Sequence, residues 1–324
     1  MIPLLILIFI FGLLFWSLSS VLVDRWHSGK WGILLGRSEC PKCRHLLWAS
    51  ELIPLFSYII QWWKCKHCST NIPIFYPLAE LLMALVFTIL SYTYIRNWGI
   101  LFSPSHILIL ATGFVTWVYI LYDLRYMEIP DQIIVPAIYI YLLLLIGSIF
   151  YSPLEVIFFD RITYTGNIED FVWDHLMAAW ILYTFFYIQI ILPGGWHLLR
   201  RGKMRDFLEL LASYAIFPIT LLFSFHKKRE ESDSEEIPTW IGGGDLRIAL
   251  FIWLTLGTLH GISSFAFAYI LGSIFGIVFL LFKWRSHLLH NQIPFGPFLG
   301  IGWIIAIFYH EIILDSIVRT LSFY

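Results

Sequence analysis

Two aspartates in similar sequence settings are the first candidates for chemistry. Asp123 lies in Tyr-Asp-Leu-Arg and Asp245 lies in Gly-Gly-Gly-Asp-Leu-Arg, and each stands at one end of an apolar stretch. Two carboxyl groups held close together do not both ionise easily, so one acts as general base on water while the other polarises an amide carbonyl. The pair therefore predicts an aspartic peptidase that needs no cofactor. Each aspartate taken alone could equally be a helix cap.

Glycines and a Pro-Asp dipeptide flank these carboxylates. Gly242 to Gly244 precede the second aspartate, and without side chains they allow the backbone to approach a substrate strand closely. Asp131 follows Pro130 and is a candidate cap for the next helix. On a helix, a residue two positions away points in a different direction, so Arg125 and Arg247 are expected to reach toward lipid phosphates.

All four cysteines lie in one short segment. They form the pairs Cys40-Pro-Lys-Cys43 and Cys65-Lys-His-Cys68, which are separated by 21 residues. This spacing is close to that of two knuckles that share one tetrahedral zinc ion. The alternative is a pair of redox dithiols, which would need access to the oxidising side of a membrane. We expect one structural zinc ion bound by the four thiolates.

The composition indicates a membrane protein. Of 324 residues, 59% are hydrophobic and 13% are charged, which is about half the charge of a soluble domain. The formal net charge of −1 excludes a nucleic-acid binder that depends on bulk positive charge. A spanning helix needs about 20 apolar residues. Candidate spans are 2–23, 76–95, 107–122, 133–150, 176–192, 248–260, 264–282 and 297–313, with a boundary between the sixth and seventh at 261–263.

The basic residues predict the orientation of these spans. With the N-terminus outside, the cytoplasmic segments hold 18 of the 21 lysines and arginines, as expected for membrane proteins. Both aspartates then lie at the cytoplasmic boundary, which requires an even number of spans between them. Two further apolar stretches, 46–63 and 207–225, have basic residues on both flanks. We expect the first to rest on the membrane surface and the second to be an interfacial or re-entrant helix bent at Pro218.

The order of these motifs resembles the bacterial type IV prepilin peptidases, polytopic aspartic proteases of the GxGD class with an N-terminal methyltransferase region. The resemblance covers nearly the whole chain. In chain order the shared motifs are Ser19-Ser20-Val21 through Arg25, Cys40-Pro-Lys-Cys43, Glu51-Leu-Ile-Pro54, Cys65 to Cys68, Tyr76-Pro-Leu-Ala-Glu80, Asp123-Leu-Arg with Ile129-Pro130-Asp131, Gly242-Gly243-Gly244-Asp245 and Ile293-Pro294-Phe295-Gly296-Pro297-Phe298. The chain departs from the family at Trp63, where a glycine is usual, and at Arg247, where a lysine is common.

The resemblance implies both site and substrate. Asp123 and Asp245 would be the catalytic pair, and the supporting residues would be Gly242, Gly244, Pro130, Asp131 and Glu80. The substrates would be type IV prepilins or type II secretion pseudopilins, cut between a basic leader and a hydrophobic helix at the cytoplasmic face of the bacterial inner membrane. Family members commonly methylate the new N-terminus with S-adenosylmethionine. Membrane lipid is the other expected partner, and nucleic acid is not.

The predicted fold is an all-α polytopic membrane protein of about eight transmembrane helices with a small cytoplasmic zinc-binding hairpin. Its parts would be a transmembrane anchor at 1–23, the four-cysteine zinc hairpin and methyltransferase region at 24–75, and a membrane-embedded peptidase domain at 76–324 that carries the 207–225 insert.

Two rival functions fit part of the pattern. One is a zinc-stabilised transporter or pilus assembly factor whose aspartates relay protons, and the other is a presenilin-like intramembrane protease. Relay carboxylates usually lie near mid-bilayer, whereas these two lie at the ends of spans. The cysteine hairpin favours the prepilin peptidases over the intramembrane proteases.

Overall fold

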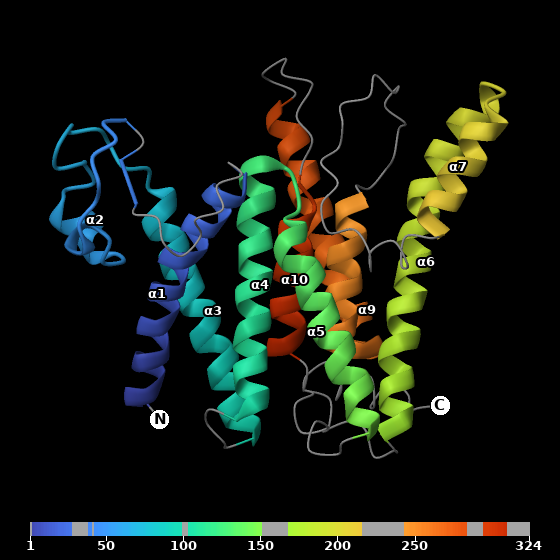
Figure 1. Cartoon of the computed structure of the whole chain (residues 1–324), viewed down its shortest axis with the longest axis horizontal. Helices are drawn as coiled ribbons and strands as arrows, with labels where there is room; N and C mark the ends of the chain where they lie inside the picture. Colours follow the sequence, from blue (N-terminus) through green and yellow to red (C-terminus); the bar gives the residue numbers. More distant parts are fainter. Residues whose placement is uncertain are drawn as a thin grey trace. The chain divides into compact units, whose positions relative to one another are not determined.

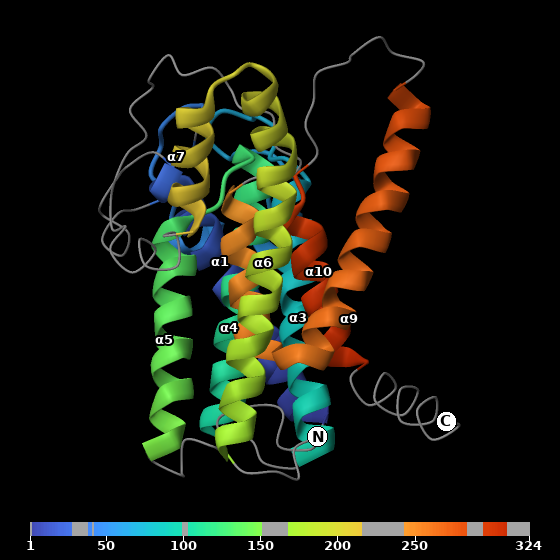
Figure 2. The same ribbon diagram turned by 90° about the vertical axis from the view of Figure 1, so that its right-hand side faces the viewer.

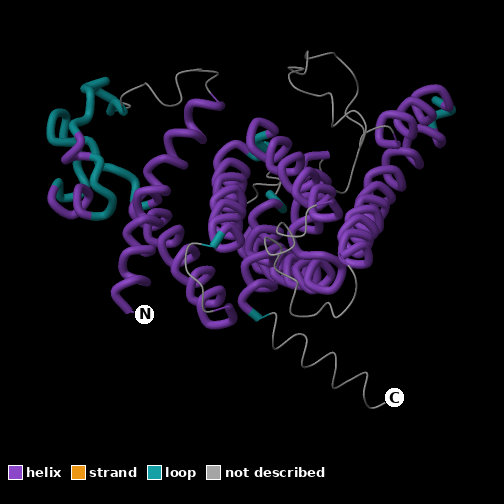
Figure 3. The backbone as a smooth tube through the Cα atoms, turned by 60° about the horizontal axis from the view of Figure 1, so that its bottom comes forward, coloured by secondary structure: helices purple, strands orange, loops and turns teal. Residues whose placement is uncertain are grey.

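The computed structural model of the chain describes residues 2–27, 38–40, 42–98, 103–150, 168–215, 243–283 and 294–309. Over these ranges the chain is almost entirely helical, and the loops that are described gather mainly in the cysteine hairpin (Figure 3). Strand-like pairing within the same ranges is limited to two isolated bridges in that hairpin. The prediction of an all-α membrane protein is therefore confirmed.

Within the described ranges, six helices are long and apolar enough to cross a membrane. They are α1 (Ile2–His27), α3 (Phe75–Trp98), α4 (Pro104–Tyr126), α5 (Asp131–Phe150), α6 (Ile168–Arg200) and α9 (Gly243–Lys283) (Figure 1). The shorter elements are the 3-10 turn η1 (Ala49–Glu51), α2 (Phe56–Ile60), α7 (Met204–Ala215) and α10 (Gly296–Phe308). Seven of the eight predicted spans fall on the six long helices, and two of the seven share α9. The eighth, 297–313, begins on α10, and its residues 310–313 lie outside the described ranges.

The chain forms two compact units. The first holds residues up to Met127 together with those from Ile304 onward, and the second holds Glu128 to Trp303. In the first unit α1 packs along α3, and α4 lies beside both. A Cβ on Gly12 of α1 would lie 2.6 Å from the Cα of Ala84 in α3, so a small residue permits this close approach. The packing of α1 and α3 against α4 supports α4, which carries Asp123 in its C-terminal half.

Helix α9 turns back on itself within the second unit. As one straight helix, its 41 residues would measure about 60 Å, twice the thickness of a bilayer core. Gly257 interrupts the helix with φ of 69° and ψ of −171°. The rings of Trp253 and Phe265 lie 6.0 Å apart, whereas a straight helix would separate these positions by about 18 Å along its axis. Figure 2 shows the two arms diverging from this turn.

The turn lies at Gly257, so the predicted boundary at 261–263 is wrong. Residues 261–263 continue the second helical arm. The sequence offered two glycines near the break, Gly257 and Gly261, and hydropathy does not distinguish between them. The left-handed φ of Gly257 is one that glycine adopts at little cost. A partner on another helix then stabilises the turn at this glycine.

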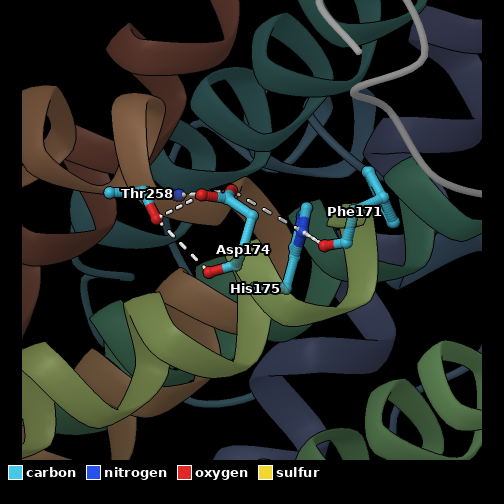
Figure 4. Close-up of polar contacts among 4 residues, drawn as sticks. All are labelled: Phe171, Asp174, His175 and Thr258. Carbon is cyan, nitrogen blue, oxygen red and sulfur yellow. Dashed lines mark hydrogen bonds and ion pairs between the residues drawn. The ribbon is translucent and has the colours of Figure 1, made fainter. Parts of the chain in front are cut away.

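That partner is Asp174 of α6. Its Oδ2 accepts a hydrogen bond from the backbone N–H of Thr258 at 3.1 Å, and its Oδ1 accepts one from the Thr258 hydroxyl at 2.7 Å (Figure 4). The first N–H groups of a helix lack partners in their own helix, so Asp174 caps the second arm of α9. A Cβ on Gly257 would lie 2.9 Å from Asp174 Oδ2, which leaves no room for a side chain. Nδ1 of the neighbouring His175 lies 4.0 Å from Asp174 Oδ2 and 3.0 Å from the carbonyl oxygen of Phe171.

Helix α10 contacts both arms of α9. Trp303 Nε1 donates to the Thr255 hydroxyl of the first arm at 3.0 Å. A Cβ on Gly302 would lie 2.3 Å from the Ser264 carbonyl oxygen of the second arm. The first arm, which carries Asp245, is therefore held from two sides, by its own second arm and by α10.

Only part of the predicted insert 207–225 is described. Residues 207–215 belong to α7, which follows a turn at Gly202 and packs along α6. The Tyr187 hydroxyl of α6 donates to the Leu211 carbonyl at 3.2 Å. The described part of α7 has 12 residues, fewer than the roughly 20 that a membrane crossing needs. Residues 216–225, including Pro218, lie outside the described ranges, and the interfacial or re-entrant course stays a prediction.

Candidate active site and metal centre

Asp123 lies one turn before the end of α4. It is 5% exposed, and its carbonyl accepts the N–H of Met127, which ends the helix in a left-handed conformation. The last turn of α4 is tied to α1, since Asp24 pairs with Arg125 and accepts the Tyr126 hydroxyl at 3.1 Å. The prediction that Arg125 reaches toward lipid is therefore wrong, because an acidic partner about 100 residues away in sequence binds it.

Asp245 lies in the first turn of α9 and is 9% exposed. A carboxylate at this position is stabilised by the positive end of the helix dipole. The preceding Gly244 packs against Ile129, whose Cδ1, Cγ1 and Cβ would lie 2.6, 3.1 and 3.2 Å from an added Cβ. The glycine therefore lets the loop before α5 cover the start of α9. The first glycine of the predicted motif, Gly242, lies outside the described residues.

An ion pair joins the starts of α5 and α9. Arg247 Nη1 binds Asp131 Oδ1, with the arginine side chain 21% exposed. Asp131 is the first residue of α5, and the Pro130 carbonyl accepts the first N–H groups of that helix from Ile133 and Ile134 at 3.1 and 3.2 Å. The prediction that Arg247 reaches toward lipid is wrong as well. Pro130 and Asp131 instead position the helix ends beside Asp245.

The two aspartates belong to different compact units, Asp123 to the first and Asp245 to the second. Each is buried and each lies at a helix end whose neighbours are fixed by an ion pair. Their action as a catalytic dyad stays a prediction.

The two cysteine pairs fold into matching knuckles. In the first, Cys40 N–H donates to the His45 carbonyl at 3.0 Å and Arg44 N–H donates to the Cys40 carbonyl at 2.8 Å. The second repeats this pattern around Cys65, with Thr70 and Ser69 in the equivalent positions at 2.9 Å for both bonds. Arg44 and Ser69, four residues after each first cysteine, both have φ of 55°. Such paired knuckles are typical of structural metal sites.

The four sulfurs form one cluster. The sulfurs of Cys40, Cys43, Cys65 and Cys68 all lie within 4.8 Å of one another, and those of Cys40 and Cys68 are 3.8 Å apart. Tetrahedral zinc with Zn–S bonds of about 2.3 Å requires sulfurs about 3.8 Å apart. Backbone N–H groups of Cys43 and Lys42 lower the pKa of Cys40, and the hydroxyl and N–H of Thr70 lower the pKa of Cys68 to about 6. Desolvation and the other three cysteine side chains raise the pKa of Cys43 to about 11, as expected where several thiols share one site. The cluster thus has the size that a metal requires, and two of its thiols ionise readily.

The hairpin is anchored to α3 through Glu80. Glu80 Oε2 accepts the N–H of Leu55 at 2.7 Å, which holds the segment before α2 against the second turn of α3. A second carboxylate, Glu51, is buried within the hairpin and accepts the Trp48 N–H at 2.9 Å. Sequence reasoning included Glu51 in a motif but assigned it no role. Its position directly before Leu-Ile-Pro was the only signal in the sequence that could have identified it as a functional residue.

Large apolar side chains cover the outer surface of the hairpin. Phe56, Ile59 and Ile60 of α2 and the nearby Trp48 and Trp62 are between 63% and 71% exposed. Glu80 holds the segment before α2 against α3, a helix long and apolar enough to cross a membrane. This arrangement fits the expected interfacial hairpin.

The chain matches one family model and several curated relatives. Residues 10–94 match the family described as the bacterial peptidase A24 N-terminal domain. The chain is 28% identical over 280 residues to the prepilin leader peptidase/N-methyltransferase of Aeromonas salmonicida (strain A449), which covers 85% of this chain and 72% of that protein. It is 25% identical over 290 residues to the protein of the same name from Bacillus subtilis (strain 168), covering 89% and 87%. A Neisseria gonorrhoeae protein of that name is 36% identical over 103 residues, 32% of this chain and 34% of that protein. No solved structure matches the chain.

Proposed function

We propose that this chain, which belongs to the family of bacterial prepilin leader peptidases/N-methyltransferases, cleaves prepilins and methylates the N-terminus that cleavage creates. The observation that carries the peptidase assignment is the pair of buried aspartates at the end of α4 and the start of α9, within a chain similar to these enzymes along most of its length. The cleaved bond would lie between the basic leader and the hydrophobic helix of a type IV prepilin or a type II secretion pseudopilin.

In the proposed mechanism Asp123 and Asp245 share one proton. The ionised carboxylate takes a proton from water, and the water oxygen bonds to the peptide carbonyl carbon while the protonated partner gives its proton to the carbonyl oxygen. The resulting tetrahedral diol returns a proton to that partner. The first carboxyl protonates the leaving nitrogen and the C–N bond breaks, so the pair finishes with one shared proton.

The surroundings of the two aspartates support this role. Burial strengthens the electrostatic coupling between neighbouring carboxyls and so favours a single shared proton. The ion pairs Asp24–Arg125 and Asp131–Arg247 hold the adjacent helix turns. Both arginines therefore have carboxylate partners outside the proposed catalytic pair.

We assign the remaining parts as follows. Cys40, Cys43, Cys65 and Cys68 bind one structural zinc ion, and Glu80 holds the hairpin against α3. S-adenosylmethionine is the methyl donor, and the hairpin contributes to the methyltransferase region.

The protein resides in the bacterial inner membrane with its active site facing the cytoplasm, where the positive-inside rule places both aspartates. A transporter or assembly factor without protease activity would not require buried aspartates at two helix ends on the same membrane face.

Cleavage of a purified prepilin by the detergent-solubilised enzyme tests the assignment. Asp123→Asn and Asp245→Asn should each reduce cleavage below detection, because an amide neither removes a proton from water nor shares one. Asp206→Asn is the matched control, since Asp206 is an exposed residue of α7. Near-normal cleavage by either active-site variant, with Asp206→Asn also active, would show that the dyad is wrong.

A further inference from the structure

A second cluster of metal-binding side chains lies in the hairpin beside the four cysteines. It consists of His45, Glu51 and His67, each of which offers one nitrogen or oxygen atom within 4.8 Å of the other two. His45 belongs to the first knuckle, His67 lies between the cysteines of the second, and Glu51 ends η1 between them. The cluster shares no side chain with the four-cysteine cluster.

The charge balance of this cluster calls for a cation. The Glu51 side chain is only 4% exposed, and burial of a carboxylate is costly without compensation. Its Oε2 accepts the Trp48 N–H, but its Oε1 has His67 Nε2 at 3.8 Å, beyond hydrogen-bond distance. His45 Nε2 is buried and makes no hydrogen bond within the described residues. A cation bound to these atoms would satisfy both groups.

We propose that His45, Glu51 and His67 bind a second divalent transition-metal ion, distinct from the ion of the four cysteines. Two imidazoles and one carboxylate suit zinc and its neighbours in the first transition row. With bonds of about 2.0–2.2 Å the three ligand atoms would lie about 3.3–3.6 Å apart. The rings of His45 and His67 lie against each other in a tilted arrangement, with centroids 3.4 Å apart and an interplanar angle of 31°. Rotation about the side-chain bonds would bring both nitrogens toward the Glu51 oxygen.

The exposure of the ligands predicts how this site differs from the four-cysteine site. The His67 side chain is 40% exposed, so three protein ligands leave a coordination position open to water. The four-cysteine site is closed, with two of its sulfur-bearing residues buried. The His-Glu-His site therefore exchanges its ion faster and loses it first to a chelator. When occupied, it links the two knuckles to the segment between them.

Metal counting on the full-length protein in detergent tests this site. The protein is equilibrated with buffered zinc, freed of unbound ion and measured by elemental mass spectrometry. Wild type should hold one ion more than His67→Gln, and Glu51→Gln should show the same loss of one ion. His197→Gln, the same chemical change on α6, should keep the wild-type count. A count that His67→Gln leaves unchanged would overturn the proposal.

Cobalt distinguishes the two sites independently of the count. Cobalt at the four cysteines gives intense sulfur-to-metal charge-transfer absorption, whereas cobalt bound by nitrogen and oxygen gives only weak visible bands. In wild type we expect the weak bands to disappear first during chelator titration, and in His67→Gln we expect only the charge-transfer absorption. Loss of both signals in His67→Gln would show that the histidine supports the hairpin fold and would also overturn the proposal.

Discussion

Substitution of Gly244 by alanine should displace Asp245 by a steric conflict whose size follows from the structure. The new Cβ would lie 2.6 Å from Ile129 Cδ1, and Cγ1 and Cβ of the same side chain would lie at 3.1 and 3.2 Å. Rotation of the terminal methyl relieves only the first contact, so the whole side chain or the start of α9 must move. Overpacking of this kind costs about 1–3 kcal/mol. If this energy must be supplied to hold Asp245 in its active position, the rate of cleavage should fall about 5- to 150-fold.

The assay is kcat for prepilin cleavage by the purified enzyme. Ile129→Ala removes Cγ1 and Cδ1, so the double variant Gly244→Ala/Ile129→Ala should recover most of the lost activity. Gly276→Ala is the control, because a Cβ there would have no neighbour within 4 Å, and its kcat should match wild type. Full activity of Gly244→Ala, or failure of Ile129→Ala to improve it, would refute the proposed contact between the loop and the start of α9.

Three further predictions follow from the hairpin and the turn of α9. Asp174→Ala removes the cap from Thr258 and should destabilise the protein by about 1–3 kcal/mol, measured as a lower thermal midpoint in detergent that Asp174→Asn partly restores; an unchanged midpoint for Asp174→Ala would contradict the capping role. A photo-crosslinking residue at Ile59, which is 66% exposed, should label phospholipid in nanodiscs, whereas one at exposed Lys66 should label it weakly; equal labelling would argue against an interfacial α2. Trp63→Gly should increase methylation of the new N-terminus without changing cleavage, as measured by mass spectrometry of the mature pilin, and a parallel loss of cleavage would show that the two activities are not separable at this position.

The sequence alone was sufficient for features that depend on short-range pattern. The predicted spans coincide with helices wherever they are described, because about 20 apolar residues must form one in a membrane. The four cysteines cluster as predicted because a Cys-x-x-Cys knuckle is a local structure, and two knuckles in one short segment have few ways to meet. The family was also recognisable, since its motifs are short and occur in a fixed order.

Only the tertiary structure identified the partners of charged and polar groups. Arg125 pairs with Asp24 and Arg247 with Asp131, whereas sequence reasoning directed both arginines to lipid. Hydropathy and helical spacing describe a single element, and these ion pairs join elements about 100 residues apart in sequence. Asp174 was missed for the same reason. Its role as a cap exists only because α6 packs beside the turn of α9, and that packing also determines that the chain turns at Gly257.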